Sequence, residues 1–347
     1  MSDMTSDMTS DATDKATGKA AGGQGVNGGT DRPYDVVVIG GGAAGLSGAV
    51  ILARARRSVL VIDAGQPRNA PASHMHGYLG HDGTPPSELL AIGRDEVTRY
   101  GGEVVQDAVV AAERLPDGAG FRVERKDGDP VVARRLLVTT GLVDELPEVP
   151  GLAERWGREV LHCPYCHGWE VASRPIGVLS TGPLAVHQAL MWRQWSEDIT
   201  LFRHTGPEPT DEEYEQLAAR GIAVVDGEVS GLEVTDDRLT GVRLAGGRVV
   251  PREAVVVQTG LIGRADVLAG LGLGAVELKM GGEVIGTYVA ADPAGETEVP
   301  GIWVAGNVAD PKGKVVVAAA AGVQAAAAIN ADLITDDVNR AVAARRA

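Results

Sequence analysis

Short apolar runs of the buried-strand type alternate with longer helical segments along the chain. Residues 35–39 (DVVVI) and 58–62 (SVLVI) are continuous apolar runs rich in β-branched residues, which is typical of strands buried on both faces. A helix is predicted over 46–56, so the three segments form one βαβ unit. Further buried strands are predicted at 136–139, 176–180, 199–202, 254–258 and 302–305, and further helices at 87–100, 183–195, 211–220 and 318–333.

This alternation predicts an α/β fold with mostly parallel sheets. Two stretches of alternating polarity, about 103–138 and 223–257, are expected to be antiparallel insertions. The order strand, glycine turn, helix occurs near 35–56 and again near 176–195, which suggests two related halves. Residues 1–30 are polar, small and glycine-rich. They cannot bury enough apolar surface to offset the entropy of ordering, so they are predicted to be disordered.

Composition narrows the function classes. The 347 residues suggest two domains, and 44% hydrophobic with 23% charged residues is an ordinary globular balance. A net charge of −15 disfavours binding to nucleic acid and to anionic membranes. The sequence has no run of about 18 apolar residues, so no membrane-spanning helix is expected. With only two cysteines and no apolar signal segment, a cytoplasmic location is expected.

A dinucleotide fingerprint follows the first predicted strand. Gly40, Gly42 and Gly45 form G-x-G-x-x-G between this strand and a helix. The glycines permit a sharp turn, close approach of a pyrophosphate, and tight helix–strand packing, and the helix N-terminus favours phosphate. Asp63 ends the next strand, where a carboxylate can accept hydrogen bonds from an adenosine ribose. The fingerprint alone does not distinguish FAD from NAD.

The only cysteines of the chain form one C-x-x-C, Cys163 and Cys166, within HCPYCHGWE (162–170). This spacing brings two sulfurs within disulfide reach, and a helix N-terminus or a charged His162 or His167 would favour the reactive thiolate. Three alternatives stay open at this stage. They are a zinc site that recruits histidines, a c-type haem attachment, and a pair of inert buried cysteines.

The segment PGIWVAGNVAD (300–310) resembles the C-terminal flavin motif of flavoproteins with two dinucleotide-binding domains. Together with the fingerprint and the C-x-x-C, in this order, it makes residues 34–333 resemble the thioredoxin-reductase-like flavoproteins. The resemblance implies two Rossmann-like (three-layer ββα) domains, with the FAD domain split in sequence. The implied division is a tail 1–33, the FAD domain 34–146 and 264–335, an inserted NAD(P)-type domain 147–263, and a C-terminal tail 336–347.

The resemblance also implies roles for individual residues. Cys166 would face the flavin, Cys163 would exchange with the substrate, and His167 would be the general acid/base. Gly306 and Asn307 would lie at the flavin ribityl chain, where Asn307 replaces the usual aspartate. Lys312 and Lys314 would lie near the flavin pyrimidine. The remaining FAD contacts implied are Ala43, Ala44, Ala64, Arg68, Asn69, Gly141 and Val315.

The second nucleotide site departs from the family pattern, so NADPH binding is uncertain. Ser180 replaces the first glycine of the second turn, and Pro183 removes a backbone N–H where phosphate would bind. Arg203 and His204 could meet a 2′-phosphate, but the acidic residues that follow them would repel it. A vestigial second domain is the preferred interpretation.

The same pattern resembles the gliotoxin- and holomycin-type dithiol oxidases. The resemblance rests on CPYCHGWE, on RNAP (68–71) and on HMHG (74–77), and it implies oxidation of a small dithiol with dioxygen as acceptor. The partner expected is a small-molecule dithiol or a thioredoxin-like protein, and family analogy favours a homodimer. His74, His76 and His81 are either a wall of the substrate pocket or solvated loop histidines. An NADPH-dependent thioredoxin reductase and a flavin-bound redox sensor remain alternatives.

Overall fold

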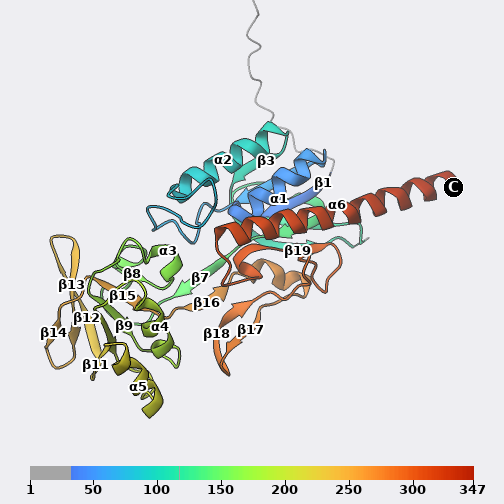
Figure 1. Cartoon of the computed structure of the whole chain (residues 1–347). Helices are drawn as coiled ribbons and strands as arrows, with labels where there is room; N and C mark the ends of the chain where they lie inside the picture. Colours follow the sequence, from blue (N-terminus) through green and yellow to red (C-terminus); the bar gives the residue numbers. More distant parts are fainter. Residues whose placement is uncertain (1–32, 117) are drawn as a thin grey trace, which may run out of the picture. The chain divides into compact units, whose positions relative to one another are not determined.

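The computed structural model describes residues 33–116 and 118–347; the tail predicted to be disordered, 1–30, lies outside them. The described residues form a seven-stranded sheet in the order β3-β2-β1-β6-β5-β4, with β19 paired to β6 (Figure 1). Its strands are β1 (Tyr34–Ile39), β2 (Val59–Asp63), β3 (Glu103–Gln106), β4 (Val109–Arg114), β5 (Phe121–Arg125), β6 (Val131–Val138) and β19 (Ile302–Val304). Because β19 comes from the far end of the chain and runs parallel to β6, both ends of the sequence build this sheet.

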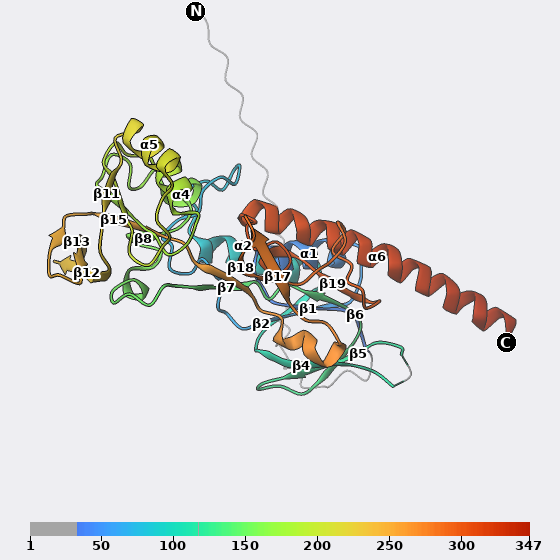
Figure 2. The same ribbon diagram turned by 90° about the horizontal axis from the view of Figure 1, so that it is seen from below.

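Three helices cover one face of this sheet: α1 (Ala43–Arg54), α2 (Pro86–Arg99) and α6 (Val315–Arg346) (Figures 1 and 2). Their apolar side chains pack with Val36, Leu137 and Trp303 of the strands in one buried cluster. A Cβ on Gly322 of α6 would lie 1.9 Å from the carbonyl oxygen of Ala44, so glycine is required where α6 crosses α1. The opposite face carries a second buried cluster. Ala112 of β4, Phe121 of β5 and Leu268 of the 3₁₀ helix η2 (Asp266–Leu271) contribute to it.

A second sheet is parallel throughout and has the order β11-β10-β9-β15-β8. Its strands are β8 (Val160–Leu161), β9 (Ile176–Leu179), β10 (Ile199–Phe202), β11 (Ala223–Val225) and β15 (Ala254–Val257). The helices α4 (Ala185–Trp192) and α5 (Asp211–Ala219) contribute to a core on one face. The antiparallel strands β12 (Val229–Thr235), β13 (Arg238–Leu244) and β14 (Val249–Val250) cover the other. The predicted fold class, two Rossmann-like three-layer domains, is confirmed.

A smaller four-stranded sheet was not predicted. Its order is β17-β18-β16-β7, with β7 (Leu142–Glu145), β16 (Gly260–Gly263), β17 (Val276–Met280) and β18 (Glu283–Tyr288). The strands β7 and β16 run antiparallel and lead out of and back into the first part of the chain, with the second sheet between them in sequence. Further short elements are the helix α3 (Pro164–His167) and the 3₁₀ helices η1 (Ala153–Arg155) and η3 (Gly306–Val308).

The two stretches predicted to be antiparallel insertions are only partly so. β3 pairs parallel with β2, and β11 pairs parallel with β10, so the start of each stretch belongs to a parallel sheet. β6 and β15, at the other ends, also pair parallel with β1 and β9. The antiparallel part of each stretch lies in its middle, where β4 pairs with β5 and β12 pairs with β13.

The last helix, α6, bears on two expectations, the C-terminal tail 336–347 and the absence of a membrane-spanning helix. It continues to Arg346, so most of the predicted tail 336–347 is helical, and Arg134 pairs with Asp336 and Asp337 at this end. It is also long and apolar enough to cross a membrane by length and composition alone, because alanines extend its apolar valines and leucines. Interior helices pass the same test, and Ala325 and Ile329 are fully buried, so the finding carries no membrane assignment.

Candidate functional site

The fingerprint turn lies between β1 and α1. Gly40 has φ +108°, and a Cβ there would lie 2.5 Å from the carbonyl oxygen of Thr139. A Cβ on Gly45 would lie 2.0 Å from the carbonyl oxygen of Gly40. At Gly42, by contrast, a Cβ would meet no protein atom within 4 Å. Packing therefore requires glycine at positions 40 and 45, whereas Gly42 borders open space.

That open space suits a pyrophosphate. Gly42 is the N-cap residue of α1 and has no side chain, so the first N–H groups of the helix, which lack intrahelical partners, are not capped by the chain itself. Asp63 Oδ1 accepts hydrogen bonds from the amides of Gly41 (3.1 Å) and Gly65 (3.2 Å), which fixes this carboxylate beside the turn. The residues present therefore fit the dinucleotide that the fingerprint predicts. Ala43 and Ala44 form the first turn of α1, and Ala64 follows Asp63.

The loop between β19 and α6, residues 305–314, contains the end of the predicted flavin motif and is called the flavin loop here. It packs against the same turn. Gly306 has φ +75°, and a Cβ there would lie 2.9 Å from Cβ of Ala44. The amide nitrogen of Asn307 donates to the carbonyl oxygens of Asp310 (2.9 Å) and Gly313 (2.8 Å). An aspartate could not make these donations. The departure from the family's usual acid thus has a local cause: the side-chain amide holds together the loop that precedes α6.

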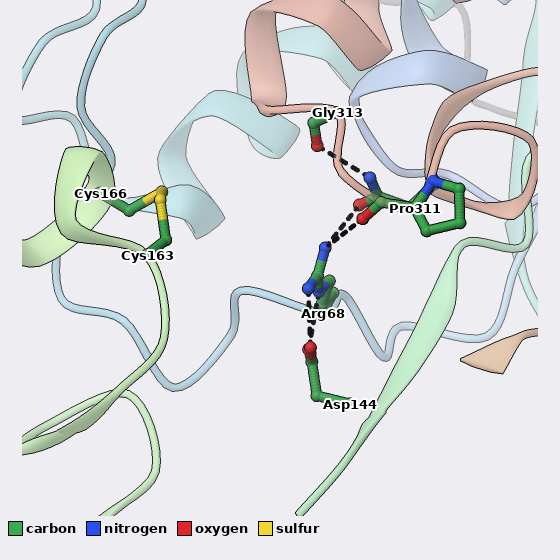
Figure 3. The surroundings of a disulfide bond; sticks show 7 residues. Arg68, Asp144, Cys163, Cys166, Pro311 and Gly313 are labelled. Atoms are coloured by element: carbon green, nitrogen blue, oxygen red, sulfur yellow. Dashed lines mark hydrogen bonds and ion pairs between the residues drawn. A yellow bond between two sulfur atoms is a disulfide. The ribbon is translucent and has the colours of Figure 1, made fainter. Parts of the chain in front are cut away.

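Arg68 joins this loop to β7 (Figure 3). Its guanidinium forms two bonds with Asp144, Nε to Oδ2 at 2.6 Å and Nη2 to Oδ1 at 2.7 Å. It also donates to Asn307 Oδ1 (3.4 Å) and to the carbonyl oxygen of Pro311 (3.2 Å). Burial acts to raise the pKa of Asp144, but the hydrogen bonds and charge of Arg68 outweigh burial and lower it. Thr259, next to β16, donates to Asp144 as well (3.1 Å).

The remaining predicted FAD contacts lie in the surrounding loops. Gly141, with φ +73° and open space at its Cβ position, precedes β7, and Val315 is the first residue of α6. Asn69 accepts a backbone hydrogen bond from Ala72. Sequence reasoning missed Asp144 and Thr259, because neither belongs to a recognisable motif. All the flavin-binding roles assigned from sequence remain predictions.

Cys163 and Cys166 form a disulfide with a Cα–Cα distance of 5.3 Å. Cys163 is the N-cap residue of α3, and its carbonyl oxygen accepts from the amides of Cys166 and His167, both at 3.2 Å. Tyr165, between the cysteines, is 62% exposed, and Trp169 is 82% exposed. The disulfide, drawn in Figure 3, thus joins two residues at a single helical turn, and exposed aromatic residues occur in the same segment of the sequence.

The flanking histidines do not supply the charge that the sequence suggested. Burial, followed by the charge of Arg68, lowers the pKa of His162 to about 4, and its ring stacks on Trp156 at 5.5 Å between centroids. Burial also lowers the pKa of His167, and neither of its ring nitrogens has a hydrogen-bond partner within the described residues. Both imidazoles are therefore neutral at pH 7, which suits proton acceptance by His167 but not stabilisation of a thiolate by an imidazolium.

Residues 162–170, which contain both cysteines, are called the redox segment. Of the three loop histidines, His76 contacts this segment. Its Nε2 lies 3.2 Å from Glu170 Oε1, and its Nδ1 lies 3.4 Å from Asp82 Oδ2. Glu170, which also acts to raise the pKa of His167, was missed as a site residue. His81 stacks on Tyr78, and His74 is exposed. His76 thus contacts Glu170 of the segment that carries the cysteines, and the role of the three histidines as a wall of a substrate pocket stays a prediction.

The flavin loop and the redox segment also meet directly. Nζ of Lys314, the N-cap residue of α6, lies 4.4 Å from the centre of the Tyr165 ring. The ring of Trp195 meets the ring of Tyr165 in a T-shaped arrangement, with 5.5 Å between the ring centroids. Lys314, four residues after the predicted flavin motif, therefore contacts the residue that precedes Cys166.

The second glycine turn, residues 180–185, packs against the loop that carries Gly206. A Cβ on Gly206 would lie 1.9 Å from Oγ of Ser180, the residue that replaces the first glycine. Arg203 forms ion pairs with Glu208 and Asp226, and His204 Nδ1 accepts from the amide of Val229 (3.0 Å). The two basic side chains that could meet a 2′-phosphate are therefore already engaged.

Metal chemistry has no support in the residues described. No group of three or more histidine, cysteine, aspartate or glutamate side chains that could hold a metal ion occurs in 33–116 or 118–347. The cysteines that a zinc site would recruit are joined to each other.

A family model described as pyridine nucleotide-disulphide oxidoreductase matches residues 34–325. The chain belongs to this family. The prediction of a thioredoxin-reductase-like protein is confirmed, and so is its class as an oxidoreductase. The family implies a flavoprotein, with NAD(P)H as a possible second nucleotide.

Relatives within the pyridine nucleotide-disulphide oxidoreductases cover much of the chain. Thioredoxin reductase sirT of Leptosphaeria maculans is 31% identical over 323 residues, which is 88% of this chain and 96% of the relative. Thioredoxin reductase tcpT of Claviceps purpurea (strain 20.1) is 36% identical over 180 residues. The match covers 56% of tcpT and 39% of a probable thioredoxin reductase of Arthroderma benhamiae, so the chain spans about half or less of these two relatives.

Solved structures agree with this assignment. The crystal structure of HlmI is 47% identical, with a TM-score of 0.82, and the match covers 90% of this chain and 96% of HlmI. An oxidoreductase from Agrobacterium tumefaciens is 37% identical, with a TM-score of 0.80, covering 88% of this chain and 99% of that protein.

Proposed function

We propose that this protein is an FAD-dependent thiol/disulfide oxidoreductase that oxidises a small-molecule dithiol and passes the electrons to dioxygen. The observation that carries the proposal is the contact between the flavin loop and the redox segment, in which Lys314 lies over Tyr165. In addition, Arg203 near the second nucleotide turn forms ion pairs with Glu208 and Asp226. The contact supports electron exchange between the cysteines and a flavin bound at this loop, and the ion pairs of Arg203 argue against NADPH as the reductant.

The exchange half-reaction follows from the disulfide. A substrate thiolate attacks Sγ of Cys163, the Cys163–Cys166 bond breaks, and Cys166 leaves as a thiolate. The second substrate sulfur then attacks the first, forming the substrate disulfide and releasing Cys163. Two electrons pass to the cysteine pair, and the two substrate protons pass to solvent or to the neutral ring of His167. Bound FAD would supply a two-electron acceptor for the reduced pair, next to Cys166.

The chain's own residues support flavin binding. Gly42 leaves open space at the start of α1, Asp63 is fixed beside the turn, and Gly306 brings the second motif against Ala44. Asn307 and Arg68 fix the loop where the family places the ribityl chain. A homodimer and a cytoplasmic location remain part of the proposal.

An NADPH-dependent thioredoxin reductase is the second candidate, because the relatives carry that name. The redox-sensor alternative is not favoured, since the chain belongs to a family of oxidoreductases. The two enzymatic candidates differ in the reductant of the flavin. Anaerobic stopped-flow absorbance of the holoenzyme, with NADPH, NADH and dithiothreitol in parallel, separates them.

We expect dithiothreitol to bleach the flavin absorbance and NADPH to leave it unchanged, and we expect air to restore it with uptake of dioxygen. A Cys166→Ser variant should keep FAD but lose bleaching by the dithiol. Rapid bleaching by NADPH would instead support the reductase. Purified protein that binds no FAD would refute both.

A further inference from the structure

The redox segment lacks the imidazolium charges that usually stabilise a thiolate. His162 and His167 are neutral because they are buried, and α3 is a single turn whose dipole is small. Other polar and charged side chains near the segment have partners. Arg68 forms an ion pair with Asp144, and Oε1 of Glu170 lies 3.2 Å from Nε2 of His76.

Lys314 differs from these groups. Its ammonium lies over the ring of Tyr165, 4.4 Å from the centroid, and it forms no ion pair within residues 33–116 and 118–347. Tyr165 stands between the two cysteines and adjoins Cys166. The positive charge of Lys314 is therefore not paired with a carboxylate within the described residues, and a cation–π contact holds it over the ring of Tyr165, which stands between the two cysteines in sequence.

The position of Lys314 depends on the flavin loop. The Asn307 amide donates to the carbonyl of Gly313, the residue before Lys314, and Arg68 donates to Pro311 in the same loop. The backbone of Lys314 is extended, with φ −76° and ψ 170°, as is usual for an N-cap residue. Its side chain provides no cap for α6 and extends to Tyr165 instead.

We propose that Lys314, held over the Tyr165 ring, is a positioning residue that stabilises the thiolate formed when the Cys163–Cys166 disulfide opens. When a substrate thiolate bonds to Sγ of Cys163, the electron pair of the broken S–S bond moves to Cys166. The negative charge then appears on the residue that follows Tyr165, whose ring contacts the ammonium group. A stabilised leaving thiolate departs faster, and the reduced pair keeps a larger fraction of thiolate near neutral pH. This inference rests on the proposed exchange function.

The test is the pH dependence of alkylation of the reduced pair in the holoenzyme. The protein is reduced anaerobically with dithiothreitol, desalted, and treated with iodoacetamide between pH 5.5 and 9.5. The variants are Lys314→Met, which keeps length but removes charge, and Lys314→Arg, which keeps charge. Lys126→Met is the matched control, since Lys126 is exposed, lies outside the sites described above, and makes no contact with an aromatic ring in the described chain.

We expect Lys314→Met to raise the apparent pKa of the reactive thiol by about 0.5 unit, so alkylation slows about threefold below that pKa and is unchanged above it. Lys314→Arg and Lys126→Met should follow the wild-type profile. A Lys314→Met profile that superimposes on wild type, or an equal shift in Lys126→Met, would overturn the inference. A uniform loss of rate at every pH would indicate a merely structural role and would also overturn it.

Tyr165 provides a second route if Lys314→Met does not fold. Tyr165→Phe keeps the aromatic face and should retain the wild-type profile, whereas Tyr165→Leu should shift it as Lys314→Met does. Failure of the proposed function has a different signature. If dithiothreitol does not reduce the wild-type disulfide at all, the exchange function fails, and this inference fails with it. If wild type is reduced and the variants match it, only the role of Lys314 fails.

Discussion

Arg68 and Asp144 form a two-bond ion pair that joins the loop after β2 to the first connecting strand, β7. The Asp144 side chain is only 4% exposed, and Arg68 is 20% exposed. The same guanidinium reaches the carbonyl oxygen of Pro311, so one side chain bonds both the connecting strand and the flavin loop. This network places the loop that carries Asn307 and Lys314 relative to the strand that leads to the cysteines.

Asp144→Asn should therefore lower the free energy of unfolding by about 2–3 kcal/mol at pH 7, because it leaves a largely buried guanidinium without its charged partner. The pKa of Asp144 is lowered in the folded state, so its contribution is present above the unfolded value and is lost as pH falls through the folded pKa. Urea denaturation followed by circular dichroism should show wild type and variant converging below about pH 4.

The control for this change is Asp82→Asn, which removes the exposed carboxylate that contacts His76. It should have no measurable effect on unfolding. An Asp144→Asn variant as stable as wild type at pH 7 would show that the Arg68 pair does not stabilise the fold.

His162 predicts a second pH dependence, with a different window. Burial and Arg68 lower its pKa to about 4 in the folded protein, against a value near 6.5 when unfolded. Below pH 6.5 the unfolded state binds more protons, so stability falls as pH decreases from 6.5 towards 4. This residue should contribute a loss of about 2 kcal/mol between pH 7 and pH 5.

His162→Phe keeps a ring to stack on Trp156 but cannot titrate. Its unfolding free energy should therefore be less sensitive to pH between 7 and 5 than that of wild type, measured by urea denaturation at both pH values. Equal slopes for the two proteins would show that His162 is not held neutral by the fold.

Substitutions at Gly42 and Gly45 of the fingerprint should have different effects, one on cofactor binding and the other on folding. Gly42→Ala introduces a methyl group into space that no protein atom occupies within 4 Å, and Gly42 has φ −78°, which alanine accepts. The variant should fold with an unchanged melting temperature in the absence of FAD, yet bind FAD roughly tenfold more weakly, about 1.4 kcal/mol. Flavin fluorescence on dilution measures the affinity.

Gly45→Ala is the contrasting change. Its methyl group would lie 2.0 Å from the carbonyl oxygen of Gly40, so the backbone must shift, at a cost of about 1–3 kcal/mol even without cofactor. If Gly42→Ala lost stability and Gly45→Ala did not, the packing roles assigned to these glycines would be reversed.

Sequence reasoning reached the parts of this protein that depend on local patterns. Continuous apolar runs located β1, β2 and β10 within one residue, and the glycine spacing located the fingerprint turn. The pairing of β7 with β16 and the contact of His76 with Glu170 depend on residues distant in sequence, for which no short motif exists. The charge state of His162 was also inaccessible, since it depends on burial that only the folded chain creates.

The departure at Asn307 could be noticed from sequence, but its cause could not. Asn307→Asp, which restores the family's usual residue, should destabilise this protein. It removes the two N–H donations to Asp310 and Gly313 and sets a carboxylate against their carbonyl oxygens, at a cost of about 2 kcal/mol. Asn330→Asp is the matched control, because Asn330 accepts from Arg57 Nε (2.8 Å) and a carboxylate keeps that role. Differential scanning calorimetry should show a lower melting temperature for Asn307→Asp alone.

A displaced loop would also move Lys314 from Tyr165, so the same variant should show the thiol pKa shift expected for Lys314→Met. An Asn307→Asp protein with wild-type stability and a wild-type alkylation profile would mean that the amide does not organise this loop.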